Sequence, residues 1–105
     1  MMTAQPTRFL ERPDGTLSYD VTDVDGPLVI AAPGMGDLRH SYRHIRDGLE
    51  NRGIRFATMD LRGMGESSTE WSDLNDEAVA SDYLALIDEL GGGPAILVGA
   101  VKLLP

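Results

Sequence analysis

The sequence predicts an α/β fold built on a mostly parallel β-sheet, and three observations lead to this class. Short apolar runs without polar alternation occur at 28–32 and 95–99, which is typical of strands covered on both faces, and residues 54–59 form a further strand-like segment. Two helical patterns separate these runs, and a turn between two further strand-like segments precedes them. Strands that alternate with helices run parallel through right-handed crossovers. The predicted order is therefore an antiparallel hairpin followed by β-α-β-α-β.

The hairpin is predicted from residues 8–12 and 16–22, which flank Pro13-Asp14-Gly15. Proline fixes φ, aspartate bonds its own backbone and glycine allows a positive φ, so this tripeptide favours a turn. The side chains expected to face the core from these two strands are Phe9, Leu17, Tyr19 and Val21.

Two helices are predicted between the later strands. The first covers about Ser41 to Arg52 and is expected to bury Tyr42, Ile45 and Leu49, which lie on one helical face. The second begins at a cap formed by Asn75 or Asp76 and ends near Leu90. Its expected buried stripe consists of Val79, Tyr83, Leu84, Ile87 and Leu90.

Composition limits the function classes. The chain has 105 residues, 9 of them basic and 17 acidic, for a formal net charge of −8. This length allows one domain, residues 1–105. The acidity argues against a nucleic-acid or anionic-membrane partner, because phosphate binding needs clusters of Lys and Arg. There is no cysteine, no apolar run long enough for a membrane span and no signal-peptide pattern, so we expect a cytoplasmic location.

Candidate sites lie in the loops that follow the parallel strands, because such sheets bind ligands beyond the carboxyl ends of their strands. These loops are 33–37, 60–68 and the residues after Gly99. In the second loop, Asp60 is expected to bond loop N–H groups and Arg62 to pair with a carboxylate. Ser67 and Ser68 lack the glycine framing of a nucleophile elbow and are interpreted as turn or cap residues.

Three segments together resemble the N-terminal part of the α/β-hydrolase fold family. Residues 28–37, reading LVIAAPGMGD, resemble the third strand and oxyanion loop of the family. Residues 53–67 are similar to its fourth strand and its D-x-R-G-x-G-x-S loop. Residues 95–99, reading AILVG, are similar to the strand that leads into its nucleophile elbow. The resemblance covers about residues 8–100 and implies hydrolysis of an ester or a related bond in the complete family, with a small-molecule substrate.

The resemblance also assigns an oxyanion site. Acyl hydrolysis develops negative charge on the carbonyl oxygen, which preorganised backbone N–H groups stabilise. By position, the donor from the loop after the third strand is the N–H of Met35, with Gly34 beside it. Gly34 and Gly36 have no Cβ, so a substrate can approach the backbone there.

The nucleophile position departs from the family pattern. The elbow G-x-S-x-G places Ser, Asp or Cys at its third position, but this chain reads Gly99-Ala100-Val101-Lys102-Leu103. Val101 has no nucleophilic atom, and the family's catalytic acid and histidine come later in chain order. We therefore expect no catalytic residue, no cofactor and no metal in this chain, and interpret it as the incomplete N-terminal half of the fold.

Other readings remain open. The first is an active hydrolase and the second a non-catalytic truncated or frameshifted product; the third, a nucleotide-binding module, is weak because Arg39 replaces a required glycine. His40 and His44 are interpreted as solvated, since no third zinc ligand is evident. Trp71 either lines a substrate pocket or covers a core edge. The last strand is expected to be an open sheet edge that favours self-association.

Overall fold

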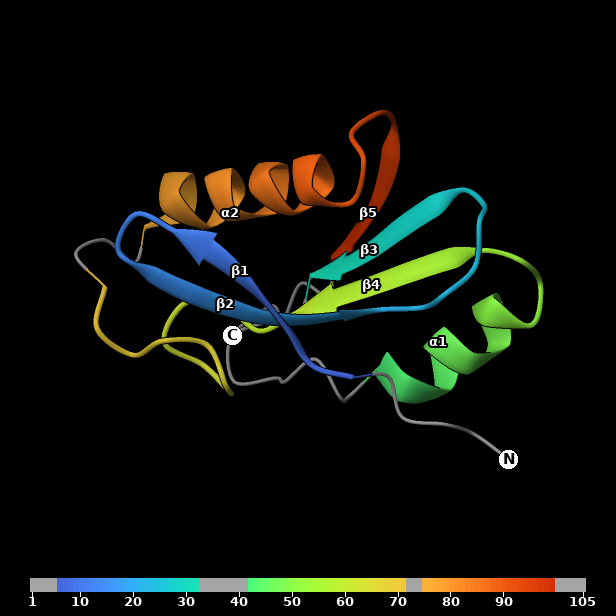
Figure 1. The fold of residues 1–105 in the computed structure, drawn as a ribbon, viewed down its shortest axis with the longest axis horizontal. Helices are drawn as coiled ribbons and strands as arrows, with labels where there is room; N and C mark the ends of the chain where they lie inside the picture. Colours follow the sequence, from blue (N-terminus) through green and yellow to red (C-terminus); the bar gives the residue numbers. More distant parts are fainter. Residues whose placement is uncertain (1–5, 33–41, 72–74, 100–105) are drawn as a thin grey trace, which may run out of the picture.

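The computed structural model describes residues 6–32, 42–71 and 75–99, which form a five-stranded sheet with one helix on each face (Figure 1). No helix in these three ranges has the length and apolar character needed to cross a membrane. In chain order the elements are β1 (Arg8–Arg12), β2 (Gly15–Val21), β3 (Leu28–Ala32), α1 (Arg43–Glu50), β4 (Arg55–Met59), α2 (Asp76–Glu89) and β5 (Ala95–Gly99).

The sheet has the strand order β1-β2-β4-β3-β5, and it confirms the predicted α/β class. β1 and β2 form the antiparallel hairpin, in which Arg12 pairs with Gly15 across the turn. β2 also pairs antiparallel with β4. β3 pairs parallel with β4 on one side and with β5 on the other, as the alternation of strands and helices predicts.

The main core lies between the sheet and α2. It joins buried side chains of all the strands except β5 to those of the helix, and its members are Leu10, Leu17, Tyr19, Val21, Leu28, Ile30, Ala57, Met59, Tyr83, Leu86 and Leu90. Phe9, expected in this core, is exposed instead. Leu10 takes its place because Leu10 pairs with Leu17 on the face that α2 covers, whereas Phe9 lies on the other face of an edge strand.

α2 begins as predicted, and its buried face follows the predicted stripe at Val79, Tyr83, Ile87 and Leu90. Its N-cap is Asn75, whose side chain accepts a hydrogen bond from the Ala78 N–H at 2.8 Å. The expected stripe is wrong at Leu84, which is 64% exposed, while Leu86 is 0% exposed at the centre of the contact. Tyr83, Leu86 and Leu90 follow helical spacing, and Leu84 lies about 100° around the helix from Tyr83.

α1 also packs differently from the prediction. Within the described part of the chain it begins at Arg43, and its buried residue is Arg46, while Ile45 is exposed. The cause is the sheet face that α1 approaches, which carries the buried polar side chains of Ser18, Asp20, Thr22 and Thr58. A guanidinium matches this face better than an aliphatic chain, and Arg46 Nη1 lies 4.0 Å from Asp20 Oδ1.

β5 forms one edge of the described sheet, with β3 as its neighbour. Its three central side chains are exposed, Ile96 by 60%, Leu97 by 53% and Val98 by 47%. Ala95, at the start of the strand, is partly buried and packs against the core cluster that includes residues of α2.

Candidate functional site

The loop after β4 is the one described loop at the carboxyl edge of the parallel strands. The loop after β3, with Gly34 and Met35, and the segment after β5, with Val101, lie outside the described residues. Their oxyanion and nucleophile assignments therefore stay predictions. The loop from Asp60 to Ser68 can be built residue by residue.

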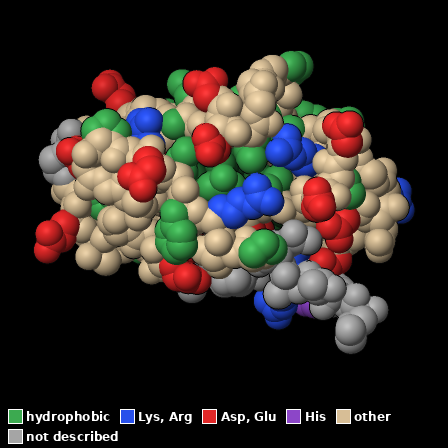
Figure 2. Space-filling model, viewed as in Figure 1, with side chains coloured by type: hydrophobic (Ala, Val, Ile, Leu, Met, Phe, Trp, Pro, Cys, Tyr) green, Lys and Arg blue, Asp and Glu red, His purple; other side chains and the backbone are tan. Residues whose placement is uncertain are grey.

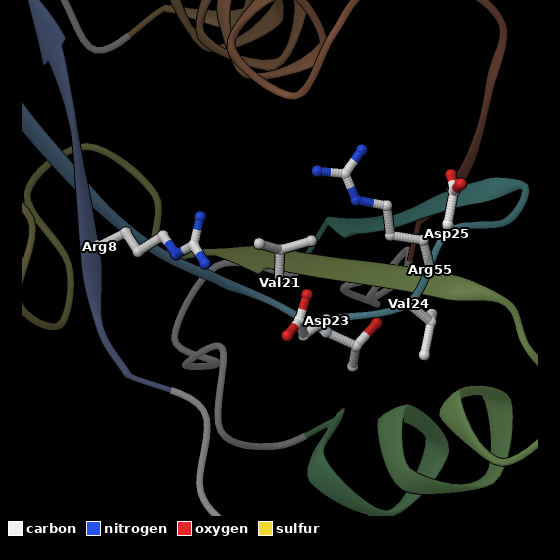
Figure 3. Close-up of a pocket in the computed structure, with 7 residues that line it drawn as sticks. Arg8, Val21, Asp23, Val24, Asp25 and Arg55 are labelled. Carbon is white, nitrogen blue, oxygen red and sulfur yellow. The ribbon is translucent and has the colours of Figure 1, made fainter.

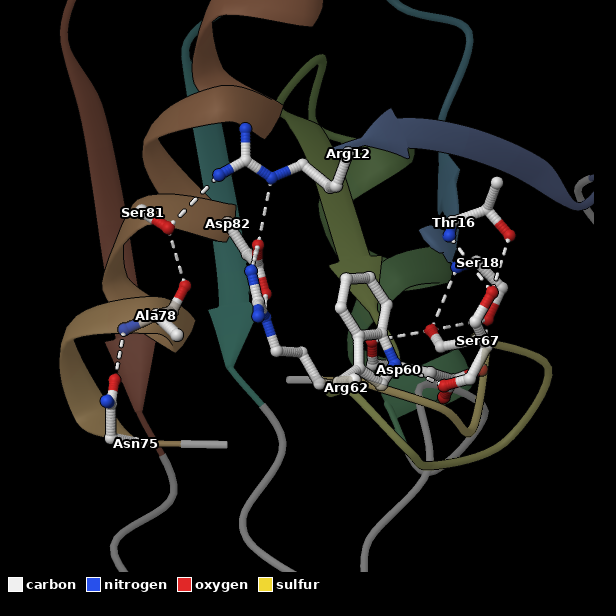
Figure 4. Close-up of polar contacts among 12 residues, drawn as sticks. Arg12, Thr16, Ser18, Asp60, Arg62, Ser67, Asn75, Ala78, Ser81 and Asp82 are labelled. Atoms are coloured by element: carbon white, nitrogen blue, oxygen red, sulfur yellow. Dashed lines mark hydrogen bonds and ion pairs between the residues drawn. The ribbon is translucent and has the colours of Figure 1, made fainter. Parts of the chain in front are cut away.

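Asp60 anchors the start of this loop (Figure 4). Its carboxylate is buried and accepts hydrogen bonds from the Ser18 hydroxyl at 2.8 Å and from the Glu66 N–H at 3.4 Å. Its carbonyl oxygen accepts from the Ser67 hydroxyl at 2.9 Å, and the Ser67 oxygen in turn accepts from the Ser18 N–H at 3.0 Å. The predicted structural role of Asp60 is thus confirmed, and its oxygens are used within the fold.

The two serines at the end of the loop attach it to β2. Ser67 bonds Ser18 as described, and the Ser68 hydroxyl accepts from the Thr16 N–H at 3.0 Å. The Ser68 N–H donates to the Thr16 carbonyl at 2.9 Å. These contacts lie along β2 beyond the residues that pair with β4. Both serines therefore attach the end of the loop to the sheet, which agrees with a structural role.

Gly65 lets the loop close over Asp60. Its φ is +52°, and a Cβ at this position would lie 2.4 Å from Asp60 Oδ2. Both the left-handed backbone and the contact with the carboxylate require glycine here. The spacing from Asp60 to Gly65 in the D-x-R-G-x-G-x-S motif therefore has a packing reason, separate from any chemistry.

Arg62 connects the loop to α2. Its guanidinium donates to both oxygens of Asp82, from Nε at 2.6 Å and from Nη2 at 2.8 Å. Arg12 of β1 adds a third bond to Asp82 at 3.0 Å and reaches the Ser81 hydroxyl at 3.1 Å. The predicted pairing of Arg62 with a carboxylate is confirmed. Asp82 is buried within the helix stripe, and an acidic residue on an apolar face is the sequence signal that could have identified it.

Trp71 covers the edge of the core beside this ion pair. The Arg62 guanidinium carbon lies 4.4 Å from the centre of the indole ring, and the indole N–H donates to the Ser68 carbonyl. The ring packs against the hydrophobic cluster. Of the two roles that the sequence left open, the structure therefore shows the structural one.

Tyr83 is a residue whose chemistry the sequence did not reveal. Its hydroxyl is buried and has no hydrogen-bond partner within residues 6–32, 42–71 and 75–99. Burial raises the pKa of this hydroxyl well above its usual range, and the nearby Tyr42, Asp82 and Asp60 act in the same direction. Tyr83 therefore stays a neutral hydrogen-bond donor close to the start of the loop after β4.

Metal binding finds no support in the described ranges. They contain no group of three His, Cys, Asp or Glu side chains that could hold an ion. His44 is exposed on α1, and His40 lies outside the description. Acidic side chains are spread over the face seen in Figure 2 and form no single patch there.

A polar cavity of about 320 Å³ lies at the opposite edge of the sheet from the loop after β4 (Figure 3). It is lined by Arg8, Val21, Thr22, Asp23, Val24, Asp25 and Arg55. Arg55 begins β4 and Val21 ends the antiparallel β2, so this is the amino edge of the parallel strands. Sites of doubly wound sheets lie at the other edge, and we assign this cavity no part in the reaction.

The comparisons with known proteins agree with this architecture. The family model described as alpha/beta hydrolase fold matches residues 27–100. Epoxide hydrolase 1 of Siraitia grosvenorii is 34% identical over 76 residues, which is 70% of this chain and 24% of that protein. Epoxide hydrolase A of Mycobacterium tuberculosis is 34% identical over 77 residues, 70% of this chain and 23% of its own length.

Solved structures give the same result. The crystal structure of an epoxide hydrolase from Vigna radiata matches with a TM-score of 0.82 at 31% identity, covering 90% of this chain and 31% of that one. The chain thus spans about a quarter of the length of the curated relatives it matches. The match of the family model to most of the sequence and the agreement of the folds lead to one conclusion: the chain belongs to the α/β-hydrolase fold family.

Proposed function

We propose that this chain supplies the oxyanion side and the supporting framework of an α/β-hydrolase that opens epoxides, with a small-molecule substrate. The observation that carries the framework role is the loop after β4. In this loop the Asp60 carboxylate accepts a hydrogen bond from Ser18, and Arg62 donates to Asp82. The Ser67 hydroxyl donates to the Asp60 carbonyl oxygen. We therefore assign these three side chains a structural role and place the catalytic groups of the enzyme elsewhere. Relatives named epoxide hydrolases support the substrate class.

The oxyanion part of the proposal rests on Met35. Opening an epoxide develops negative charge on the ring oxygen, and hydrolysis of an ester does so on the carbonyl oxygen. A backbone N–H fixed in the loop after β3 would stabilise either charge, and the family places such a donor in this loop. An ester is therefore the second substrate class to test.

We further propose that the 105 residues alone do not catalyse hydrolysis. Val101 stands where the family has its nucleophile and has no atom that can attack a carbon centre. Purified chain mixed with styrene oxide or p-nitrophenyl acetate is expected to form no more product than buffer. Product formation above the buffer rate would contradict the proposed inactivity if Met35→Leu retains it and Met35→Pro, which removes the backbone N–H, abolishes it.

A chimera tests the framework and the substrate class. Residues 6–99 replace the matching segment of the Mycobacterium tuberculosis epoxide hydrolase A, which keeps that enzyme's own elbow and later residues. The chimera is expected to hydrolyse styrene oxide, and Met35→Pro to lower kcat by roughly 100-fold or more while Met35→Leu does not. A folded chimera that leaves the epoxide intact, or equal rates in both variants, would contradict the proposal.

A further inference from the structure

Charged side chains of both signs line the polar cavity at the amino edge of the parallel strands (Figure 3). Arg8 and Arg55 carry the positive charges, and Asp23 and Asp25 carry the negative ones. In the described part of the chain none of the four forms an ion pair, and the Arg55 guanidinium donates to the Leu90 carbonyl at 2.8 Å. The cavity thus brings together cations and anions that do not neutralise one another by direct contact.

The sheet places the two arginines on the same face. Arg8 comes two residues before Leu10 of the core, and Arg55 pairs with Leu28 of the same core. Side chains alternate between the faces of a strand, so both arginines project on the side that α2 covers. Figure 3 shows them extending toward each other with the buried Val21 between them. An oxyanion over Val21 would therefore accept hydrogen bonds from both guanidinium groups.

The two aspartates restrict the charge of a ligand. Asp23 and Asp25 lie between β2 and β3, and both are exposed, with their side chains lining the same cavity. A ligand with only negative charge would be repelled by these carboxylates, and one with only positive charge would be repelled by the guanidinium groups. The lining therefore matches a ligand that carries one charge of each sign.

The first part of the sheet builds this cavity. Its lining residues come from β1, β2, the turn between β2 and β3, and β4. β5 is separated from β4 by β3 and contributes none of them. The volume of about 320 Å³ lies at the lower end of the range for small-molecule sites, roughly 300–1,000 Å³. A small ligand is therefore the kind that fits.

We propose that this cavity binds a small zwitterion of the amino-acid class, with its carboxylate between Arg8 and Arg55 and its ammonium group toward Asp23 and Asp25. Guanidinium groups bind carboxylates through paired N–H donors. An ammonium group brings three N–H donors, for which carboxylates are acceptors. The cavity lies at the opposite edge of the sheet from the loop after β4, so the inference does not depend on the proposed hydrolase activity.

Nuclear magnetic resonance of the isotope-labelled full chain tests the proposal. Glycine, β-alanine and γ-aminobutyrate differ in the separation of their two charges, and each is added up to about 50 mM so that weak binding is detected. The backbone amide signals of residues 21–25 and 55 should shift and saturate with at least one of them. Acetate and methylammonium carry one charge each and should bind at least about tenfold more weakly.

Variants that remove one charge test the two ends of the ligand. Arg8→Gln and Asp23→Asn change exposed side chains of the cavity, and each is expected to raise the Kd of the bound amino acid at least about fivefold. Arg52→Gln and Asp88→Asn are the matched controls, because they remove the same charges from exposed side chains outside the lining. These controls should leave Kd within about twofold, since solvent and salt screen distant charges.

Three outcomes of the titrations would overturn the proposal: no shift with any of the three amino acids, shifts confined to residues outside the cavity, or acetate binding as tightly as the amino acids. Equal Kd values for Arg8→Gln and Arg52→Gln would also overturn it. Circular dichroism shows whether each variant is folded. If one cavity variant loses structure, the other decides the question against its own control.

Discussion

Arg62 and Asp82 join the loop after β4 to the middle of α2 by two hydrogen bonds of 2.6 and 2.8 Å. The guanidinium and the carboxylate are 7% and 2% exposed, so the pair is shielded from solvent. Bidentate geometry of this kind fixes both position and orientation. The loop at the carboxyl edge of the sheet therefore depends on a residue twenty positions later in the sequence.

Asp82→Asn should cause a large loss of stability. The change leaves Arg12 and Arg62 without their anionic partner, and breaking a buried ion pair costs roughly 3–5 kcal/mol of unfolding free energy. Asp88→Asn is the control, because it makes the same change at an exposed position of the same helix and should cost less than about 0.5 kcal/mol. Urea unfolding followed by circular dichroism measures both, and equal losses would contradict the assigned role of Asp82.

Gly65→Ala should disturb the loop more than Gly63→Ala. Both glycines have positive φ, so each alanine is strained by about 1 kcal/mol. At Gly65 the new Cβ would also lie 2.4 Å from the Asp60 carboxylate, whereas nothing lies within 4 Å at Gly63. Unfolding free energies of the two variants give the difference. Adding Asp60→Ala to both variants should reduce the difference between their unfolding free energies, because the carboxylate that the new Cβ meets is gone. An unchanged difference would show that the extra cost at Gly65 does not come from Asp60.

The strands could be predicted closely because their signals are local. The ranges of β3 and β5 match the prediction at both ends, since a proline precedes each apolar run and fixes its start. The hairpin likewise follows from Pro13-Asp14-Gly15. The buried faces of the helices depend on the surface beneath them, which the sequence does not display. Ile45 was expected to be buried, but Arg46 is buried instead because the sheet under α1 is polar.

In the candidate site, too, local roles could be predicted from the sequence and distant contacts could not. Asp60 and Arg62 were predicted to be structural, because their motif indicates side chains that bond a loop and a carboxylate. The partner of Arg62 was not identified, since Asp82 lies twenty positions later in the sequence, on another element. Contacts between residues far apart in the chain need the fold before they can be assigned.

Leu86→Ala and Leu84→Ala test which of these two leucines of α2 faces the core. Both remove the same atoms from the same helix, but Leu86 is buried in the core and Leu84 is exposed. Leu86→Ala should cost about 2–5 kcal/mol of unfolding free energy through lost burial and the cavity it leaves. Leu84→Ala should change stability by less than about 0.5 kcal/mol. Similar losses at both positions, measured by urea unfolding, would mean that α2 is rotated from the orientation described.

Tyr83→Phe should change how stability depends on alkaline pH. The folded-state pKa of Tyr83 lies above the unfolded value of 10.0, chiefly because burial disfavours the phenolate. Below pH 10 both states keep the proton, and this contribution to stability is fully present. As pH rises above 10 the unfolded chain ionises first, so stability falls. Tyr83→Phe removes the ionisable group, so the unfolding free energy of this variant should fall less between pH 10 and pH 11 than that of the unchanged protein.

The same substitution should leave neutral stability unchanged or raise it by about 1 kcal/mol, because it deletes a buried hydroxyl that has no described partner. Unfolding free energies of both proteins at pH 8 and pH 11 test the two effects together. A marked loss at pH 8 would show that the hydroxyl makes a hydrogen bond that matters. An unchanged fall toward pH 11 would show that Tyr83 ionises as readily in the folded chain as in the unfolded one.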